Sequence, residues 1–120
     1  MAEVAVETRI HDDTVVVALA GEIDISTSQL VTDAIDEALE GRTRPDVLCC
    51  DLTNVTFLDS TGISALLAGR RASEDAGTEM VLVGSHGNVR RVLQLSRVDS
   101  LFRQFGNVEE FRSSHVSGSQ

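Results

Sequence analysis

Apolar and polar residues follow a strand-like pattern in the first part of the chain. The stretch Val4–Ile10 alternates loosely, and Thr14–Leu19 is a β-branched run whose strand closes at Gly21–Asp24. The acidic pair Asp12-Asp13 between the two runs is typical of a tight turn. The pattern therefore predicts that a β-hairpin opens the fold.

Two later apolar runs show no alternation. Val47–Cys50 and Met80–Val83 are continuous, which is typical of strands that are covered on both faces. Leu101–Phe105 indicates a short edge strand closer to the C-terminus. Together with the hairpin, these runs predict a sheet of four to five strands.

The gap between the second and third predicted strands carries an amphipathic helical pattern. Ser26 or Thr27 can cap this helix, and Gly41 ends it. Its apolar residues recur in pairs every four positions: Leu30, Val31, Ala34, Ile35, Ala38 and Leu39.

Three further helical patterns follow. One ends at Gly77, and another begins after Gly84–Gly87. Asn107 can cap a final helix over Val108–Ser113. The residues that lie on one side of the second and third helices are Ile63, Leu66, Leu67 and Arg70, and then Val89, Val92, Leu93 and Leu95.

Strands that alternate with helices after an opening hairpin are typical of an α/β domain with a mixed, mostly parallel sheet. The length of 120 residues fits one domain, and the pattern contains about four helices and no interior linker or repeat. We expect a single domain over residues 1–113 and a flexible C-terminal tail, rich in Ser and Gly, over residues 114–120.

The core must be aliphatic, because the chain has no Trp, no Tyr and only four Phe. Cys49 and Cys50 are adjacent in a predicted strand, so their side chains point to opposite faces and cannot easily form a disulfide with each other. No histidine lies nearby in sequence to complete a metal site. We interpret both cysteines as small core residues in a reducing compartment and predict no bound metal.

The net charge of −9 is concentrated near the N-terminus, where residues 1–40 contain ten acidic residues and one arginine. An acidic excess repels phosphate backbones and anionic lipids, which argues against nucleic-acid partners and favours a basic protein partner. An acidic surface that serves only solubility explains the charge equally well. No apolar run approaches the ~18 residues of a membrane span, and the N-terminus lacks the features of a signal peptide. We therefore expect a cytoplasmic protein without membrane insertion.

Motifs of several enzyme and nucleotide-binding classes are absent. The chain has no lysine, which a Walker loop requires after its glycines and which receiver domains of two-component systems also carry. The G-x-S-x-G pattern of serine hydrolases is missing too. His86 is the one histidine that the predicted fold can bring towards Ser60, although a lone loop histidine is usually just solvated. We predict that the protein is not an enzyme and uses no cofactor.

The segment FLDSTGI, Phe57–Ile63, places two hydroxyl groups and a carboxylate where a strand passes into a helix. Ser60 can simply be the N-cap of that helix, a role worth about 1 kcal/mol, and Asp59 or Thr61 can fill it instead. Capping alone therefore does not demand the whole cluster. Gly62 is a poor helix former, and its missing side chain would let another molecule approach the neighbouring hydroxyl.

Phosphorylation of Ser60 is the sharper hypothesis. It adds roughly −1.5 to −2 charges at neutral pH, and a helix N-terminus tolerates an anion because its N–H groups and dipole favour one. A docked partner would meet a bulky dianion beside Asp59 and, if the loops converge, beside Glu22 and Asp24. Binding would then be lost through steric conflict and repulsion while the domain stays folded.

Three segments carry a resemblance to a known family and cover most of residues 4–105. They are CDLTNVTFLDSTGISALL, LAGEIDISTSQLV and, more weakly, LVGSHGNVRRVLQLSRVDSLFRQF. The first segment is similar to the pattern D-L-S-x-V-x-F-[IL]-D-S-[ST]-G-[IL] of the STAS family, and the second is similar to the family's pattern G-E-[IL]-D. The resemblance is specifically to stand-alone bacterial anti-sigma factor antagonists. One departure is Ser96-Arg97-Val98, where the family often reads T-G-L.

The resemblance implies a mechanism. Members of this family bind an anti-sigma factor that is itself a serine kinase, and so release a sigma factor to RNA polymerase. The kinase uses ATP to phosphorylate the serine of the D-S-[ST]-G motif, which falls on Ser60 here. A metal-dependent serine phosphatase reverses the reaction. By this likeness the chain is a substrate rather than an enzyme, and phosphorylation inactivates it.

The expected partner-binding surface combines the loop before the first helix with the loop around Ser60. Asp24 matches the family's acidic position before that helix, and Asp59 and Gly62 match the motif. Arg70 and Arg71 either mark the far edge of this surface or are ordinary solvated residues. The residues that we assign to the surface are Glu22, Asp24, Ser26, Thr27, Asp59, Ser60, Thr61 and Gly62.

Two alternatives remain from the sequence. The chain could be a structural STAS module, either a subunit of a stress-signalling scaffold or the small soluble component of a lipid-transport complex. It could also bind nucleotide, as some STAS proteins are thought to do, although no phosphate-binding motif supports this. The intact D-S-T-G sequence favours the phosphorylation switch.

Overall fold

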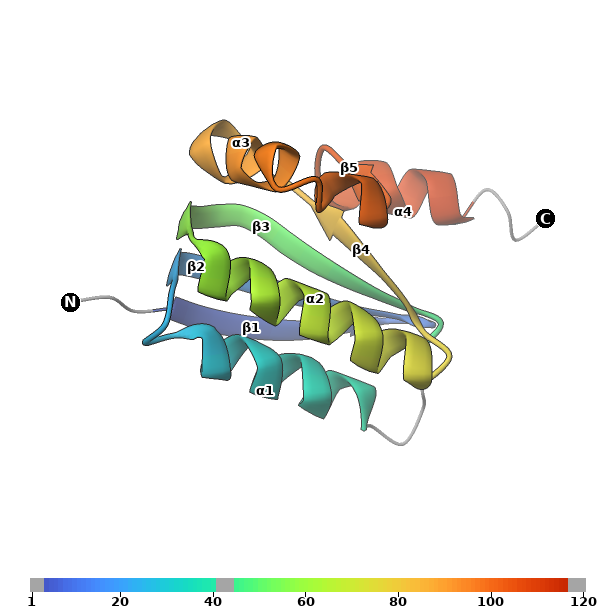
Figure 1. Ribbon diagram of the computed structural model, residues 1–120. Helices are drawn as coiled ribbons and strands as arrows, with labels where there is room; N and C mark the ends of the chain where they lie inside the picture. Colours follow the sequence, from blue (N-terminus) through green and yellow to red (C-terminus); the bar gives the residue numbers. More distant parts are fainter. Residues whose placement is uncertain (1–3, 41–44, 117–120) are drawn as a thin grey trace.

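The computed structural model describes residues 4–40 and 45–116, which form a single sheet with helices on both faces (Figure 1). Strands and helices alternate after an opening hairpin, as the sequence predicted. In chain order the elements are β1 (Val4–His11), β2 (Thr14–Ile23), α1 (Ser28–Leu39), β3 (Val47–Leu58), α2 (Ser60–Asp75), β4 (Glu79–Val83), α3 (Gly87–Leu95), the 3-10 turn η1 (Asp99–Leu101), β5 (Gln104–Phe105) and α4 (Val108–Val116).

The five strands lie in the order β1-β2-β3-β4-β5. β1 pairs antiparallel with β2, and every later pairing is parallel. The turn of the hairpin contains Asp12, whose φ of 54° places it in the left-handed region that aspartate tolerates better than most residues. This mixed, mostly parallel sheet confirms the predicted α/β class.

Two hydrophobic clusters stabilise the two faces of the sheet. The larger one joins β2, β3 and β4 to α1, α2 and α3, and the smaller one joins the opposite face to α4 through Phe111. Cys50 belongs to the first cluster and Cys49 to the second, so the two thiols do point to opposite faces. Burial raises the pKa of Cys49 to about 12 and also raises that of Cys50, so both thiols stay protonated.

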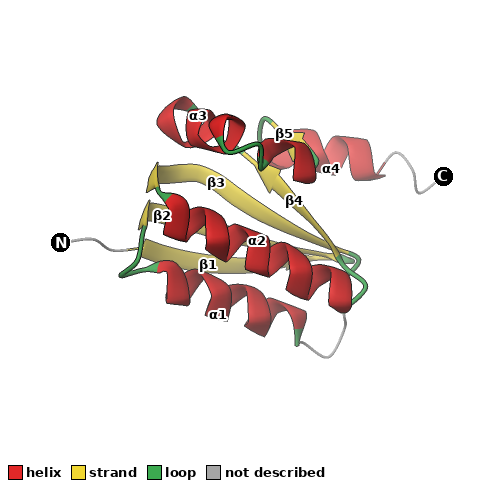
Figure 2. Ribbon diagram, viewed as in Figure 1, coloured by secondary structure: helices red, strands yellow, loops and turns green. Residues whose placement is uncertain are grey.

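β3 is much longer than its apolar run. It continues past Cys50 to Leu58, so FLDSTGI begins inside a strand (Figure 2). Exposed residues Thr53 and Asn54 interrupt the apolar pattern, and the pairing with β2 shifts register between Ala18 and Ala20. The exposed polar residues and the register shift break the continuous apolar run, which explains why the strand predicted from the sequence ended early.

Several predicted details are corrected by the packing. Leu30 is 51% exposed and Leu95 is also exposed, although both fit the helical pattern. Only Gln104–Phe105 of the predicted edge strand forms a strand, and η1 precedes it. α4 continues to Val116, three residues beyond the predicted end.

Other details at the helix ends stand as follows. Asn107 caps α4 as predicted, because its Oδ1 accepts the N–H of Glu110 at 2.7 Å. Gly41, the predicted end of the first helix, lies outside the described residues. The division of the chain into a domain over residues 1–113 and a flexible tail over residues 114–120 stays a prediction.

We predict that Leu66→Ala lowers the free energy of unfolding by about 2–5 kcal/mol, because it opens a cavity in the larger cluster. Leu30→Ala removes the same atoms from an exposed site and should cost under about 0.5 kcal/mol. Urea unfolding of both variants measures the difference. Equal losses would contradict this division between core and surface.

Candidate functional site

The two loops that the sequence assigned to the partner surface lie side by side. β2 and β3 are parallel neighbours, and their last pairs are Glu22 with Phe57 and Ile23 with Leu58. The N–H of Asp59 donates to the carbonyl of Ile23 at 3.4 Å, just beyond both strands. The loop before α1 and the start of α2 therefore meet at the same end of the sheet (Figure 2).

The loop before α1 is held by its own polar side chains. One carboxylate oxygen of Asp24 accepts the N–H of Ser26 at 2.9 Å and its hydroxyl at 2.7 Å. The buried hydroxyl of Thr27 donates to the carbonyl of Glu22 at 2.6 Å and accepts the N–H of Asp24 at 2.9 Å. The hydrogen bonds from Ser26 and Thr27 lower the pKa of Asp24. The loop therefore presents a preformed carboxylate.

The capping roles predicted for this loop change accordingly. Thr27 occupies the N-cap position of α1, but its side chain makes no capping hydrogen bond, and Ser26 lies before it. The hydroxyl of Thr27 is already committed to Glu22 and Asp24. Thr27 therefore supports the loop from inside, whereas Glu22 and Ser26 are exposed.

Asp59, not Ser60, is the N-cap of α2. Its Oδ1 accepts the N–H of Gly62 at 3.0 Å. Ser60 is the first helical residue, is exposed, and its hydroxyl has no hydrogen-bond partner among the described residues. Thr61 beside it is half-buried. The simple capping interpretation of Ser60 is thus wrong, and its hydroxyl is available for other chemistry.

Gly62 is buried and brings α2 into contact with the ends of β2 and β3. A Cβ atom at this position would lie 2.7 Å from the carbonyl oxygen of Ile23 and 2.5 Å from Cδ1 of Leu58. The missing side chain therefore serves internal packing. It does not make room for an incoming molecule, as the sequence had suggested.

The two segments that meet at this end of the sheet also contain exposed apolar residues that the sequence analysis missed. Ile25 is 81% exposed in the loop before α1, and Phe57 is 38% exposed at the end of β3. A groove of about 220 Å³ runs between α1 and α2, with Gln29 and Thr61 in its lining. An exposed isoleucine in a tight acidic loop was the one signal in the sequence that could have revealed this apolar component.

His86 lies apart from this site. Its Nε2 is 2.8 Å from the carbonyl oxygen of Thr53, and the hydroxyl of Thr53 donates to Asp51 at 2.6 Å. These contacts connect the loop after β4 to β3. The structure therefore gives no support to an approach of His86 to Ser60.

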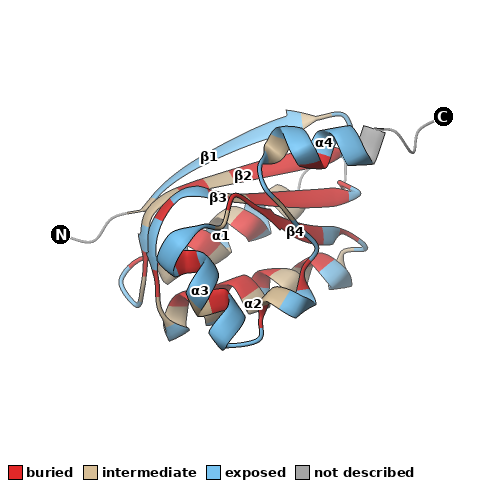
Figure 3. Cartoon of the chain, turned by 90° about the horizontal axis from the view of Figure 1, so that it is seen from above, coloured by how far each residue is buried: buried red, intermediate tan, exposed pale blue. Residues whose placement is uncertain are grey.

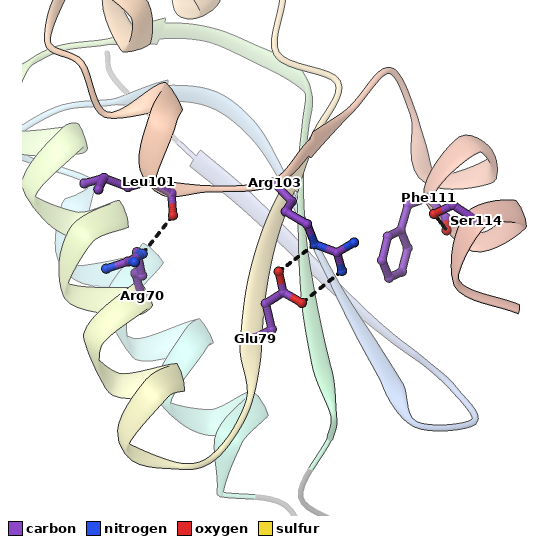
Figure 4. A network of polar contacts seen from close by, with 6 residues as sticks. All are labelled: Arg70, Glu79, Leu101, Arg103, Phe111 and Ser114. Atoms are coloured by element: carbon purple, nitrogen blue, oxygen red, sulfur yellow. Dashed lines mark hydrogen bonds and ion pairs between the residues drawn. The ribbon is translucent and has the colours of Figure 1, made fainter. Parts of the chain in front are cut away.

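A polar cluster farther along α2 is structural (Figure 4). Arg70 donates to the carbonyl of Leu101 at 2.9 Å and forms an ion pair with Glu74 at 3.2 Å. Arg103 makes two hydrogen bonds to Glu79, at 2.7 and 2.9 Å. These bonds fasten the segment around η1 to α2 and β4, so the side chain of Arg70 is already engaged. Arg71 is exposed.

The described part of the chain contains no candidate metal site. No group of three or more His, Cys, Asp or Glu side chains in it is placed to hold a metal ion. None of the helices in residues 4–40 and 45–116 combines the length and apolar character of a membrane span.

Comparisons with known proteins place these observations in a family. Residues 5–111 match the STAS domain. An anti-sigma-F factor antagonist of Mycobacterium tuberculosis, RsfB, is 33% identical over 102 residues, which is 83% of this chain and 80% of that protein. An anti-sigma F factor antagonist of Paenibacillus polymyxa is 28% identical over 102 residues, covering 85% and 86% of the two chains.

A solved structure supports the same fold. The Bacillus cell fate determinant SpoIIAA in its phosphorylated form superposes with a TM-score of 0.70 at 22% identity, covering 92% of this chain and 98% of that one. At this level of identity the likeness concerns the arrangement of strands and helices, and it agrees with the fold class predicted from the sequence.

We predict that Asp59→Ala lowers the free energy of unfolding by about 1 kcal/mol, because the N–H of Gly62 loses its acceptor. Ser60→Ala is the matched control and should leave stability nearly unchanged. Urea denaturation distinguishes the two. A larger loss of unfolding free energy in Ser60→Ala than in Asp59→Ala would indicate that Ser60 is the cap.

We also predict that Gly62→Ala destabilises the protein, although alanine is the better helix former by up to about 1 kcal/mol. The new methyl group would collide with the backbone at Ile23, which cannot move aside as a side chain can. Ser64→Ala, at an exposed position of the same helix, should be neutral or slightly stabilising. A thermal midpoint for Gly62→Ala at or above that of the wild type would contradict the packing role.

Proposed function

The chain belongs to the STAS domain family, and from this premise we propose that it is a cytoplasmic anti-sigma factor antagonist that phosphorylation of Ser60 inactivates. The unmodified protein binds an anti-sigma factor, which then releases its sigma factor. The anti-sigma factor is also the serine kinase that modifies Ser60. A metal-dependent serine phosphatase restores the active form.

The observation that carries this proposal is the uncommitted hydroxyl of Ser60. It is exposed at the start of α2, while Asp59 performs the capping that would otherwise occupy it. A kinase can therefore reach the hydroxyl without unfolding the helix. The first N–H groups of α2 and the helix dipole would stabilise the phosphate that results.

The surroundings of Ser60 explain how a phosphate would prevent binding. A partner that docks over the two loops would also meet Ile25 and Phe57, whose apolar side chains are exposed in the segments that lead into α1 and α2. Burying a phosphate dianion in such a contact costs far more free energy than burying a hydroxyl. The phosphate would add to three carboxylates, those of Glu22, Asp24 and Asp59, in two segments that contain no basic residue.

The chemistry of the switch lies in the partners. Ser60 supplies the attacking oxygen, the γ-phosphoryl group of ATP is transferred to it, ADP leaves, and the proton passes to a base on the kinase. Glu22, Asp24 and the exposed Ser26 would contact the kinase from the loop before α1. Thr27, Asp59 and Gly62 would act indirectly, because they hold the two loops in position.

The alternative function is a structural module of a signalling scaffold or of a lipid-transport complex. Such a role requires the same fold but no uncommitted serine at this position. The two functions predict different partners. They also differ over Ser60, because its modification should abolish binding in the first function and leave binding unchanged in the second.

We predict that Ser60→Ala retains an anti-sigma factor kinase during purification from the native cells, and that Ser60→Asp loses it. The added carboxylate imitates part of the charge of the phosphate at the centre of the contact. Co-purification followed by mass spectrometry measures the partners. Incubation of the purified pair with ATP and magnesium should add one phosphate to the wild type and none to Ser60→Ala.

Ser113→Asp is the matched control, because it adds the same charge at an exposed position on α4, on the opposite face of the sheet. It should retain the kinase as the wild type does. If all three variants capture the same scaffold or transporter subunits, the switch is refuted and the structural module becomes the better explanation.

A further inference from the structure

The two edges of the sheet differ in a way that points to an additional interaction surface. One edge is β5, which contains only two residues. The other is β1, which contains eight residues, no proline, no lysine and no register shift against β2. Long regular edge strands readily pair with further strands, and proteins usually protect them with prolines, bulges or charged side chains, lysines above all. β1 has no proline and no bulge, and its two charged residues, Glu7 and Arg9, carry opposite charges that can attract a second strand instead of repelling it.

β1 is also open to solvent over most of its length (Figure 3). Its residues from Ala5 to Ile10 are all exposed, including Val6 at 39% and Ile10 at 76%. Among the described residues the only strand that pairs with β1 is β2. A row of backbone hydrogen-bonding groups therefore faces away from the sheet.

The hairpin register identifies these groups. His11 and Thr14 close a two-residue turn, and such a turn is closed by a hydrogen-bonded pair. Hydrogen-bonded and non-bonded pairs then alternate along antiparallel strands. Arg9 and Glu7 therefore bond to β2 through their backbone, whereas the N–H and C=O groups of Val6, Thr8 and Ile10 point outward.

We propose that β1 pairs antiparallel with β1 of a second copy of this chain, around a two-fold axis at Thr8. In this register the two Thr8 residues exchange backbone hydrogen bonds, and Val6 of each copy does so with Ile10 of the other. Glu7 of each copy then lies directly opposite Arg9 of the other. The two five-stranded sheets become one continuous sheet of ten strands.

Charge selects this register over its neighbours. An axis at Glu7 would satisfy the same backbone groups but would place two glutamates opposite each other, and an axis at Arg9 would do so with two arginines. Like charges directly opposite each other are destabilising, and opposite charges are stabilising. Neither Glu7 nor Arg9 forms an ion pair within the described residues. Both are therefore available for the second copy.

The other face of β1 supplies the apolar contact. Val6 and Ile10 lie opposite Leu19 and Val15 of β2, which belong to the larger hydrophobic cluster. Pairing of the two copies would place Val6 against Ile10 twice and extend that cluster across the axis. The order of charged and apolar residues in β1 is thus complementary to itself when reversed, a property that an unrelated partner strand would not require.

The paired form leaves both Ser60 sites accessible. Each site lies at the end of β2 and β3, and the two-fold axis reverses the strand direction in the second copy. The two sites would therefore lie at opposite ends of the joined sheet. This geometry predicts that Ser60→Asp leaves the dimer intact, so a failure of the proposed switch and a failure of the dimer are distinguishable.

The test is the oligomeric state of charge-swapped variants by analytical ultracentrifugation over a wide range of concentration. The wild type should dimerise, and Glu7→Arg and Arg9→Glu should each weaken self-association about tenfold or more. The double variant should dimerise again. An equal mixture of the two single variants should form a heterodimer, because each then supplies the charge that the other lacks.

Two further measurements make the test specific to this register. Thr8→Pro removes an outward N–H without breaking a bond to β2, so it should abolish the dimer at nearly unchanged stability, whereas Thr8→Val should keep it. The amides of Val6, Thr8 and Ile10 should become protected from hydrogen exchange as the concentration rises.

Glu109→Arg and Arg91→Glu, at exposed positions on α4 and α3, are the matched controls for the charge reversals and should dimerise as the wild type does.

Three results would overturn the proposal. One is a wild type that stays monomeric at all concentrations and whose β1 amides remain unprotected from hydrogen exchange. The β1 edge would then be open to a different extended partner. Another is a dimer that survives the single charge reversals and Thr8→Pro unchanged. The third is a mixture of the single variants that does not associate.

Discussion

The contact between the first turn of α2 and the end of β2 is the constraint on which the site depends. Gly62 lies against the carbonyl of Ile23, and the N–H of Asp59 donates to the same carbonyl. Because β2 and β3 are parallel neighbours, this contact brings two loops together that are more than thirty residues apart in sequence. Without it, Asp24 and Ser60 would not share a surface.

The site divides its polar residues into two kinds. Thr27, Asp59 and Asp24 satisfy backbone N–H groups or other side chains, and so they hold the loops in position. The side chain of Ser60 makes no hydrogen bond of this kind among the described residues, and the side chains of Ile25 and Phe57 are exposed. A rigid frame therefore surrounds a hydroxyl whose chemical state can change without a change of fold. This is the arrangement that a switch based on local charge requires.

The two proposed surfaces use opposite properties of the same sheet. At the carboxyl ends of β2 and β3, irregular loops present an acidic and partly apolar surface that the rest of residues 4–40 and 45–116 leaves exposed. At the β1 edge, regular backbone and alternating side chains form a surface that matches its own reverse. The first is suited to a different protein and the second to a second copy. Because they lie on different parts of the sheet, one molecule could use both.

The sequence by itself determined the order of the elements, the opening hairpin, the aliphatic core and the segment that contains Ser60, because local periodicity and turn residues encode these features. Only the tertiary structure decided which of several equivalent residues plays each role. Leu30 and Val31 fit the same helical pattern, but only Val31 meets the sheet. Asp59, Ser60 and Thr61 could all cap α2, and the hydrogen bond from the N–H of Asp59 to the carbonyl of Ile23 holds Asp59 where its Oδ1 reaches the N–H of Gly62. Such choices depend on neighbours that are distant in sequence, and a local pattern carries no information about them.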